Sequence, residues 1–257
     1  MYRYVAFIYG LAAYVISVAT ILCAVGFVGN IFVAKSIDSG FEEPSGEALL
    51  TNLFWLALFA LQHSVMARES FKKRWTRIIP APIERSTYVL IASLVLLLLF
   101  RNWAAMPGVV WEIDSPTGQR IVELLFWTGW LIALSATFSI DHSDLFGLRQ
   151  VRLYLRGEPY TPVKFQMPAL YRCVRHPTML GLSIAFWAAP VMTAGHLLFA
   201  AAATAYIFIG ISFEERDLTA RFGAAYEEYR RRIPMIFPLP RKRMKKFILP
   251  PSALILS

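Results

Sequence analysis

The chain contains few charged residues and few cysteines. Charged side chains make up 17% of its 257 residues, against about a quarter in soluble domains, and hydrophobic residues make up 57%. Cys23 and Cys173, the two cysteines, lie far apart in the sequence, so we expect no disulfide framework. The apolar residues come in long blocks without a period of two, which argues against a transmembrane β-barrel. These features predict an α-helical integral membrane protein.

Two kinds of ligand-binding motif are also missing from the sequence. No G-x-G-x-x-G follows a strand pattern, which argues against a Rossmann domain. The four histidines and two cysteines are dispersed without the spacing of a zinc site, so we predict no metal. The net charge is +9, but no base-stacking motif accompanies the basic residues. We attribute this charge to cytoplasmic loops and predict no nucleic-acid partner.

Six apolar segments are each close to the ~20 residues that a helix needs to cross a bilayer. The fifth is the shortest, and only "PVMTAGH" separates it from the sixth, which predicts a tight helical hairpin. Counted as one re-entrant unit, this hairpin would leave five full spans. The expected fold is all-α: a polytopic membrane protein with five to six transmembrane helices and a cytoplasmic C-terminal helix. The segments cover residues 4–33, 48–66, 86–105, 121–140, 178–194 and 196–213.

The charges of the connecting loops alternate along the chain. Residues 67–85, residues 141–177 and the tail after residue 213 are rich in Lys and Arg, whereas residues 35–47 carry mainly carboxylates. Because Lys and Arg favour cytoplasmic loops, both termini and all the unusual polar stretches are predicted to be cytoplasmic. We interpret the chain as one domain. It would comprise a four-helix membrane part (1–140), a cytosol-facing part with the hairpin (141–234) and a basic, lipid-associating tail (235–257).

The stretch "YRCVRHPTMLG", residues 171–181, places polar side chains at the start of the fifth apolar segment. Proline is favoured in the first turn of a helix, so Pro177 fixes His176 at a helix N-terminus. Unpaired N–H groups and the helix dipole suit that position to an anion such as a carboxylate. Gly181 would let a ligand or another backbone approach the first turn. The alternative, of about equal weight, is an interfacial cap whose arginines reach lipid phosphates.

Two carboxylates, Glu214 and Glu215, come directly after the sixth apolar segment. In a hairpin, the start of one helix and the end of the next lie at the same membrane face, so His176 and Glu214 are predicted neighbours. A helix start that accepts a carboxylate, beside a glutamate that accepts an ammonium group, is suited to an amino acid. The alternative is an acidic helix end paired with Arg216 or Arg221.

The stretches "YRCVRHPTMLG" and "EERDLTARFGAAYEEYRRRIP", joined by a hairpin, resemble the C-terminal signature of the isoprenylcysteine carboxyl methyltransferase superfamily of membrane enzymes. This resemblance covers about a quarter of the chain. It implies S-adenosylmethionine (SAM) as the methyl donor, bound at the cytosolic face by residues 141–234. The apolar and aromatic stripe in the second stretch is by itself typical of a packing face, and consists of Leu218, Phe222, Tyr226 and Tyr229.

The same resemblance assigns residues to the cofactor pocket. The His-Pro element of the family matches His176 and Pro177, although Met179 replaces its aromatic residue, and Tyr171 matches the preceding tyrosine. Glu214 matches a cofactor-binding glutamate, and residues 163–166 align with a pocket-lining stretch. The residues expected to bind the cofactor are His176, Pro177, Tyr171, Glu214, Glu215, Gly181, Lys164, Phe165 and Arg175.

Other stretches narrow the acceptor. "LFALQHSVMAR", "PIERSTYVL" and "DHSDLFGLRQVRLYLRG" are similar to bacterial methanethiol S-methyltransferases and NnrU-like membrane proteins. This similarity implies methyl transfer to methanethiol, giving dimethyl sulfide, in the bacterial cytoplasmic (inner) membrane. Prenylcysteine methyltransferases hold their substrate's carboxylate with an arginine where this chain has Gly210, so prenylated cysteine is not the expected acceptor.

Methyl transfer to a thiol needs a group that removes the thiol proton, because only a few per cent of a small thiol is ionised at neutral pH. His63 in "LQHS" and His142 in "DHSD" are candidate bases, and we favour His142 because Asp141 and Asp144 flank it. Either histidine could instead be a hydrogen-bonded interfacial residue. The predicted catalytic residues are thus His142, His63 and Asp141, whereas His196 is expected to be structural.

Two other functions stay open at this stage. The same scaffold could methylate hydrogen sulfide, a lipid or an isoprenoid. The chain could also be a non-enzymatic NnrU-like protein that handles or transports a small molecule, which predicts no SAM binding and a polar path across the bilayer. The apolar segments contain no buried charge that suggests such a path. The expected partners are therefore a small thiol and membrane lipids, with the oligomeric state open.

Overall fold

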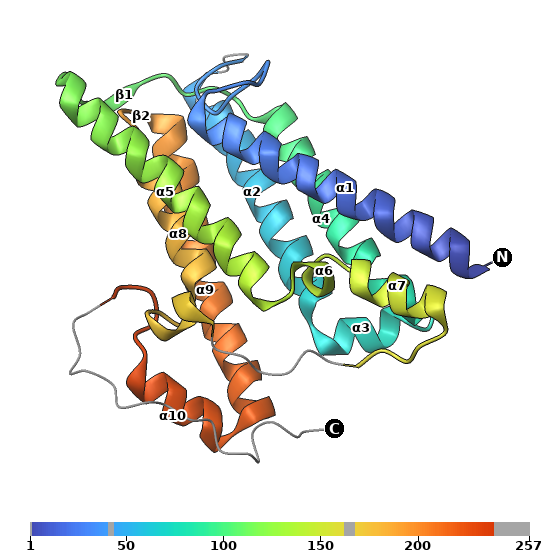
Figure 1. The fold of residues 1–257 in the computed structure, drawn as a ribbon. Helices are drawn as coiled ribbons and strands as arrows, with labels where there is room; N and C mark the ends of the chain where they lie inside the picture. The colour runs from blue at the N-terminus through green and yellow to red at the C-terminus, as the bar shows by residue number, and fades with distance from the viewer. Residues whose placement is uncertain (1, 41–43, 162–167, 239–257) are drawn as a thin grey trace.

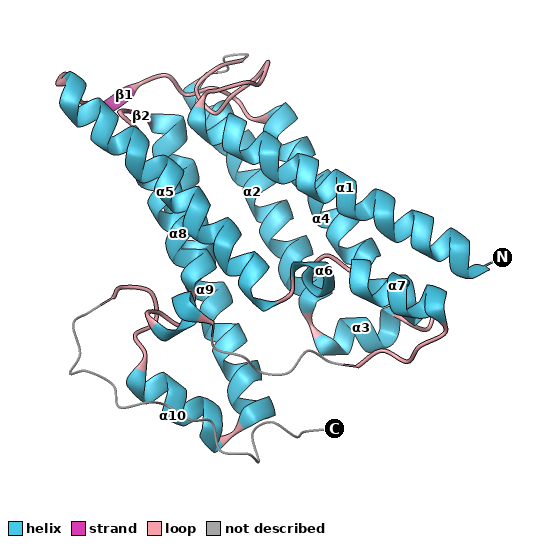
Figure 2. Cartoon of the chain, viewed as in Figure 1, coloured by secondary structure: helices cyan, strands magenta, loops and turns pink. Residues whose placement is uncertain are grey.

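The computed structural model describes residues 2–40, 44–161 and 168–238, and helices dominate it (Figure 1, Figure 2). The elements in chain order are α1 (Tyr2–Gly29), α2 (Ser45–Ala67), α3 (Glu69–Trp75), α4 (Ala81–Asn102), β1 (Val109–Glu112), α5 (Pro116–Ile140), α6 (His142–Leu145), α7 (Leu148–Arg156), the 3₁₀ helix η1 (Ala169–Arg172), α8 (Pro177–Trp187), β2 (Val191–Thr193), α9 (Ala194–Phe222) and α10 (Ala224–Arg232).

Five helices among the described residues are long and apolar enough to cross a membrane: α1, α2, α4, α5 and α9. Large apolar side chains such as Leu50, Leu124 and Leu131 remain exposed along them, as expected for helices whose outer surface faces lipid. The predicted all-α, polytopic membrane fold is confirmed. Five full spans were one of the two counts that the sequence allowed.

The fifth apolar segment differs from a full span. It forms α8, whose 11 residues give only about 16 Å of helix. The helix stops before Pro190, which cannot continue the hydrogen-bond ladder. The chain then becomes extended, and β2 pairs antiparallel with β1 of the α4–α5 connection (Figure 2). The unit of α8 and β2 therefore reaches the far end of the bundle even though its helix is short.

The position of α8 is set by a close crossing with α5. A Cβ atom on Gly181 would lie 2.5 Å from the carbonyl oxygen of Gly129, and a Cβ on Gly129 would lie 2.6 Å from that of Gly181. Glycines at both positions let the two backbones approach, as in other tightly packed membrane helices. This crossing fixes the start of α8, which carries His176.

The two ends of the bundle differ in composition. Figure 1 places α3, α7 and α10 at one end and the β1–β2 pair at the other. The start of α1 lies at the first end, where the Arg3 guanidinium is 5.7 Å from the centre of the Tyr154 ring in α7. Basic residues cluster in the last turns of the short helices at this end, among them Lys72, Lys73, Arg74, Arg156, Arg230, Arg231 and Arg232.

At the opposite end, the α1–α2 connection is tied to the start of α9. Asp38 accepts hydrogen bonds from Asn30 Nδ2 at 2.6 Å and from the Thr193 hydroxyl. The His196 ring is buried, with Nδ1 3.9 Å from Asp38 Oδ2 and Nε2 3.0 Å from the Phe186 carbonyl oxygen. This arrangement agrees with the structural role expected for His196.

Candidate active site

His176 is the N-cap residue of α8, and Pro177 occupies the first turn, as the sequence predicted. The buried His176 ring lies between two carboxylates of α9. Its Nδ1 atom is 3.5 Å from Glu214 Oε2, and its Nε2 atom is 3.1 Å from Glu215 Oε1. The predicted proximity of His176 and Glu214 is therefore observed.

The two glutamates differ in their partners. Glu215 Oε1 accepts a hydrogen bond from Arg175 Nε at 2.8 Å and lies 2.7 Å from a second nitrogen of the same guanidinium. Arg175 also donates to the carbonyl oxygens of Arg230 and Ile233, at the end of α10. Arg175 and Glu215 thus bind each other and hold α10 against the hairpin, so we remove both from the predicted cofactor contacts. Glu214 is the accessible carboxylate, with 51% of its side chain exposed against 13% for Glu215.

Tyr171 lies beside the first turn of α8. Its side chain hydrogen-bonds Thr178, and its pKa is raised mainly by burial and further by the nearby Glu214 carboxylate. Its carbonyl oxygen accepts a hydrogen bond from the Tyr229 hydroxyl at 2.7 Å, which joins η1 to α10. Tyr171, Thr178 and Glu214 therefore surround the helix start. The sequence had not singled out Thr178, whose only signal is its position directly after Pro177.

Tyr226 is a further residue that the sequence placed only in a packing stripe. The predicted packing is present, because Tyr226 and Tyr229 form a cluster with Leu218 and Phe222. The Tyr226 hydroxyl, however, has no hydrogen-bond partner within the described ranges. Burial, assisted by the Glu215 charge, raises its pKa to about 12. It is therefore a neutral, buried hydroxyl close to the Arg175–Glu215 pair.

Three further residues were predicted to bind the cofactor: Gly181, Lys164 and Phe165. Gly181 is buried and lies against the backbone of α5, which is the second of the two explanations given for a glycine there. We therefore leave it out of the pocket. Lys164 and Phe165 lie outside the described residues.

We favoured His142 as the base because Asp141 and Asp144 flank it in the sequence, and the structure does not support this reason. The His142 ring packs against Phe138, with the ring centres 4.5 Å apart, and against Tyr14. Among the residues that the structure describes, no ion pair joins His142 to Asp141 or Asp144. Those carboxylates therefore do not orient it as a base.

Asp141 instead caps α6. Its carboxylate accepts hydrogen bonds from the Ser143 hydroxyl at 2.7 Å and the Asp144 N–H at 3.1 Å. Arg149 lies 3.8 Å from Asp141 and 3.1 Å from Asp144. Burial acts to raise the pKa of Asp141, but these hydrogen bonds and the Arg149 charge outweigh it and lower the pKa. Asp141 is thus an ionised helix cap, and its catalytic role stays a prediction.

His63 lies in a different environment, one turn from the end of α2. The Tyr88 hydroxyl of α4 is 3.0 Å from His63 Nε2 and 3.2 Å from Nδ1. The Tyr206 ring of α9 is 6.3 Å from the His63 ring, and the Tyr206 hydroxyl is 3.1 Å from that of Ser64. We call His63, Ser64, Tyr88 and Tyr206 the histidine–tyrosine cluster. The sequence reasoning missed its last two members, whose only signal is a hydroxyl within an apolar segment.

Helix α9 connects this cluster to the His176 site. Tyr206 precedes Glu214 by about two helical turns, or about 12 Å. Gly210 lies between them, and apart from the adjoining backbone of α9 no atom of the described residues lies within 4 Å of the position that its Cβ would take. Further along the helix, the Arg68 guanidinium covers the Phe213 ring at 3.9 Å. Helix α9 is therefore open at Gly210, whereas Phe213, next to Glu214, is covered.

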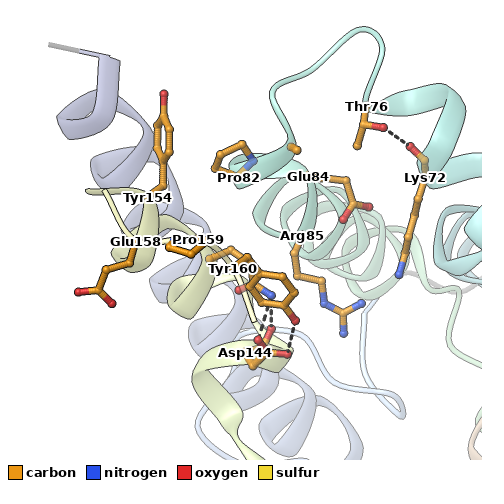
Figure 3. Close-up of a pocket in the computed structure, with 12 residues that line it drawn as sticks. Lys72, Thr76, Pro82, Glu84, Arg85, Asp144, Tyr154, Glu158, Pro159 and Tyr160 are labelled. Carbon is orange, nitrogen blue, oxygen red and sulfur yellow. Dashed lines mark hydrogen bonds between the residues drawn. The ribbon is translucent and has the colours of Figure 1, made fainter. Parts of the chain in front are cut away.

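A pocket of about 690 Å³ lies next to the cluster, between α3, the start of α4 and α7 (Figure 3). Glu84 and Arg85 line it, and the Arg85 guanidinium is 5.0 Å from the centre of the Tyr88 ring. Asp144 accepts hydrogen bonds from Gln150 and Tyr160 on the opposite wall. The pocket thus adjoins the histidine–tyrosine cluster from the end that carries the basic helices.

Comparison with known proteins supplies the family. The chain matches the model of the NnrU protein family over residues 52–219. It is 52% identical to Methanethiol S-methyltransferase of Mycobacterium tuberculosis, over 94% of this chain and 99% of that protein. It is 51% identical to Methanethiol S-methyltransferase 1 of Bradyrhizobium diazoefficiens, over 94% and 85%. Nurim of Rattus norvegicus is more distant, at 32% identity over 66% of this chain and 70% of that protein.

No solved structure matches the chain significantly. The matched residues 52–219 include the histidine–tyrosine cluster, the start of α8 and Glu214. The two relatives named as methanethiol S-methyltransferases share about half of the aligned residues over 94% of this chain. On these grounds the chain belongs to the NnrU family of proteins.

Proposed function

We propose that this protein is an enzyme that transfers a methyl group from SAM to methanethiol, giving dimethyl sulfide and S-adenosylhomocysteine. The names of its relatives support this reaction. The main structural support is the contact between His176 and Glu214 at the start of α8. The same face of α9 leads from this pair to a histidine that can accept a proton.

The residues at the start of α8 fit the amino-acid part of SAM. In the described chain no side chain caps this helix end, so its first N–H groups are available to a carboxylate. The accessible Glu214 carboxylate suits an ammonium group, and the Tyr171 hydroxyl lies nearby. SAM, when bound, supplies the electrophilic methyl group. Lys164 and Phe165 remain expected contacts by family resemblance alone.

We assign the removal of the thiol proton to His63. Tyr88 holds its ring, and the open face of α9 over Gly210 offers space for a small thiol between His63 and Glu214. A thiolate and a sulfonium lose their charges as they react, so an apolar site favours the reaction over water. Alignment of the acceptor with the methyl group lowers the barrier further.

The orientation in the membrane follows from charge. We infer that the end with α3, α7 and α10 faces the cytoplasm, because Lys and Arg cluster there. The start of α1 lies at this end, so both termini would be cytoplasmic in a bacterial inner membrane. On this basis residues 1–140 form the membrane part and residues 141–234 the cofactor-binding part, followed by the basic tail.

The test is a binding measurement combined with an acceptor panel. Calorimetry on the purified protein in detergent is expected to show SAM binding in the wild type. Chromatography is then expected to show S-adenosylhomocysteine formed with methanethiol and far less with hydrogen sulfide or a prenylated cysteine. Binding with a different preferred acceptor would overturn the acceptor assignment. Absence of both binding and product would favour a non-enzymatic membrane protein.

A further inference from the structure

We propose that Tyr88 and Glu84 conduct the thiol proton from His63 to the pocket of Figure 3, which releases it to the cytoplasm. This inference rests on the proposed methyl transfer. In each turnover the thiol S–H bond breaks, its electron pair stays on sulfur, and that sulfur forms the new bond to the methyl carbon. The electron pair of the broken methyl–sulfur bond remains on the donor's sulfur. One proton therefore has to leave the site for every product formed.

A proton on His63 needs an exit because the histidine lies within the apolar bundle. A charged group there is costly unless it is paired. The rings around His63 belong to Phe59, Tyr88 and Tyr206, none of which is an acid partner at neutral pH. The positive Arg85, placed over the Tyr88 ring, also repels a retained proton.

Tyr88 is the first step of the exit. Its hydroxyl is 3.0 Å and 3.2 Å from the two His63 nitrogens, so it can accept a proton from the ring. In the proposed exit it then gives up its own proton toward Glu84. Glu84 precedes Tyr88 by one turn on α4, which places both side chains on the same helix face. The step from Tyr88 therefore leads toward the start of α4 and the pocket.

Glu84 is the second step. Its Oε1 atom is buried, and within the described ranges it has no hydrogen-bond partner. An unpaired buried carboxylate oxygen is rare in folded proteins and calls for a partner such as water. The pocket that Glu84 lines has room for several water molecules (Figure 3). These waters can pass the proton to bulk solvent.

Titratable groups of both signs line the pocket. Burial lowers the pKa of Lys72, and the neighbouring Arg85 lowers it further, against the opposing effect of Glu84. Arg85 is fixed by donating from Nε to the Leu145 carbonyl oxygen at 2.7 Å. The remaining titratable groups that line the pocket are Asp144, Tyr154, Glu158 and Tyr160.

The experiment compares Glu84→Gln with Glu84→Asp and with Glu158→Gln, a change in an exposed carboxylate of the same pocket. In the wild type, dimethyl sulfide formation is first established. Glu84→Gln is then expected to lower kcat for methanethiol about tenfold or more, with unchanged SAM affinity. Glu84→Asp and Glu158→Gln are expected to stay near the wild type. The Glu84→Gln defect should shrink as the pH rises toward the thiol's pKa, and added small weak-acid buffers should partly restore the rate.

Two results would overturn the proton exit. One is a Glu84→Gln rate equal to that of Glu158→Gln at every pH and buffer concentration. The other is a loss of rate that neither pH nor buffer relieves and that comes with weaker SAM binding, because this indicates a structural role. An inactive wild type would instead count against the methyl transfer, so the two failures are distinguishable.

Discussion

The side chains of His176 and Glu214 lie far apart in the sequence, yet their Nδ1 and Oε2 atoms are 3.5 Å apart at the base of a helical hairpin. The adjacent Glu215 also contacts the His176 ring, at 3.1 Å, but it is paired with Arg175 as well. Two neighbouring carboxylates of one helix thus differ in accessibility, and on this basis we propose a ligand contact for Glu214 and a structural role for Glu215.

Glu214→Gln is expected to affect SAM affinity, whereas Glu215→Gln is expected to affect stability. Glu214→Gln removes the proposed partner of the ammonium group, so SAM affinity falls about tenfold or more while thermal unfolding changes little. Glu215→Gln leaves the buried Arg175 without its counter-charge, so the free energy of unfolding falls by roughly 3–5 kcal/mol. Calorimetry with SAM and thermal unfolding in detergent measure both quantities. Equal effects of the two changes on SAM affinity would contradict the assignment.

His63→Gln is expected to lower kcat about a hundredfold or more, because general-base catalysis contributes on that order. His142→Gln is expected to leave kcat within about threefold of the wild type. Steady-state rates at saturating SAM give the comparison. A larger loss for His142→Gln than for His63→Gln would restore the interpretation that the sequence suggested.

Gly181→Ala is expected to destabilise the protein by roughly 1–3 kcal/mol, because the added methyl group meets the α5 backbone at 2.5 Å. Gly210→Ala is the matched control within another helix. Its new Cβ meets no atom within 4 Å, so stability stays the same or rises slightly. Thermal unfolding of both variants checks the α5–α8 crossing, and a stable Gly181→Ala protein would disprove it.

Asp38→Asn is expected to reduce stability at neutral pH by roughly 1–3 kcal/mol. Burial acts to raise the pKa of Asp38, but contacts with His196, Thr193 and Asn30 outweigh it and hold the pKa below its ordinary value of 3.8. A carboxyl with a lowered folded-state pKa stabilises the protein above that ordinary value, and the contribution is lost as the pH falls through the folded pKa. The free energy of unfolding, measured from pH 7 to pH 3, should therefore fall less steeply in Asp38→Asn than in the wild type or in the exposed control Asp114→Asn. Parallel curves for all three proteins would count against this role.

The spans, the hairpin and the His176–Glu214 contact could be predicted from the sequence because each has a local signal. Apolar length predicts the spans, Pro177 marks a helix start, and a short hairpin brings its two helix ends together. Pro190 gives a local reason for the early end of α8, but the pairing of β2 with β1 was not predictable from composition, because β1 belongs to the distant α4–α5 connection.

The reason for preferring His142 over His63 was a sequence neighbourhood that the structure does not keep as a set of contacts. Asp141 and Asp144 flank His142 in the sequence, but the chain turns sharply at Gly147, whose φ of 83° favours glycine. That turn starts α7 and brings Arg149 onto both carboxylates. The partners of His63 come from α4 and α9, and no local pattern could reveal such contacts.

The most direct test of the methyl transfer is headspace gas chromatography of the purified protein given SAM and methanethiol, with Glu214→Gln and the exposed-site control Glu227→Gln beside it. We expect dimethyl sulfide from the wild type and from Glu227→Gln, and about tenfold less or none from Glu214→Gln at limiting SAM. No dimethyl sulfide from a folded wild-type protein would contradict the proposed reaction. Equal amounts from all three would show that Glu214 does not hold the methyl donor.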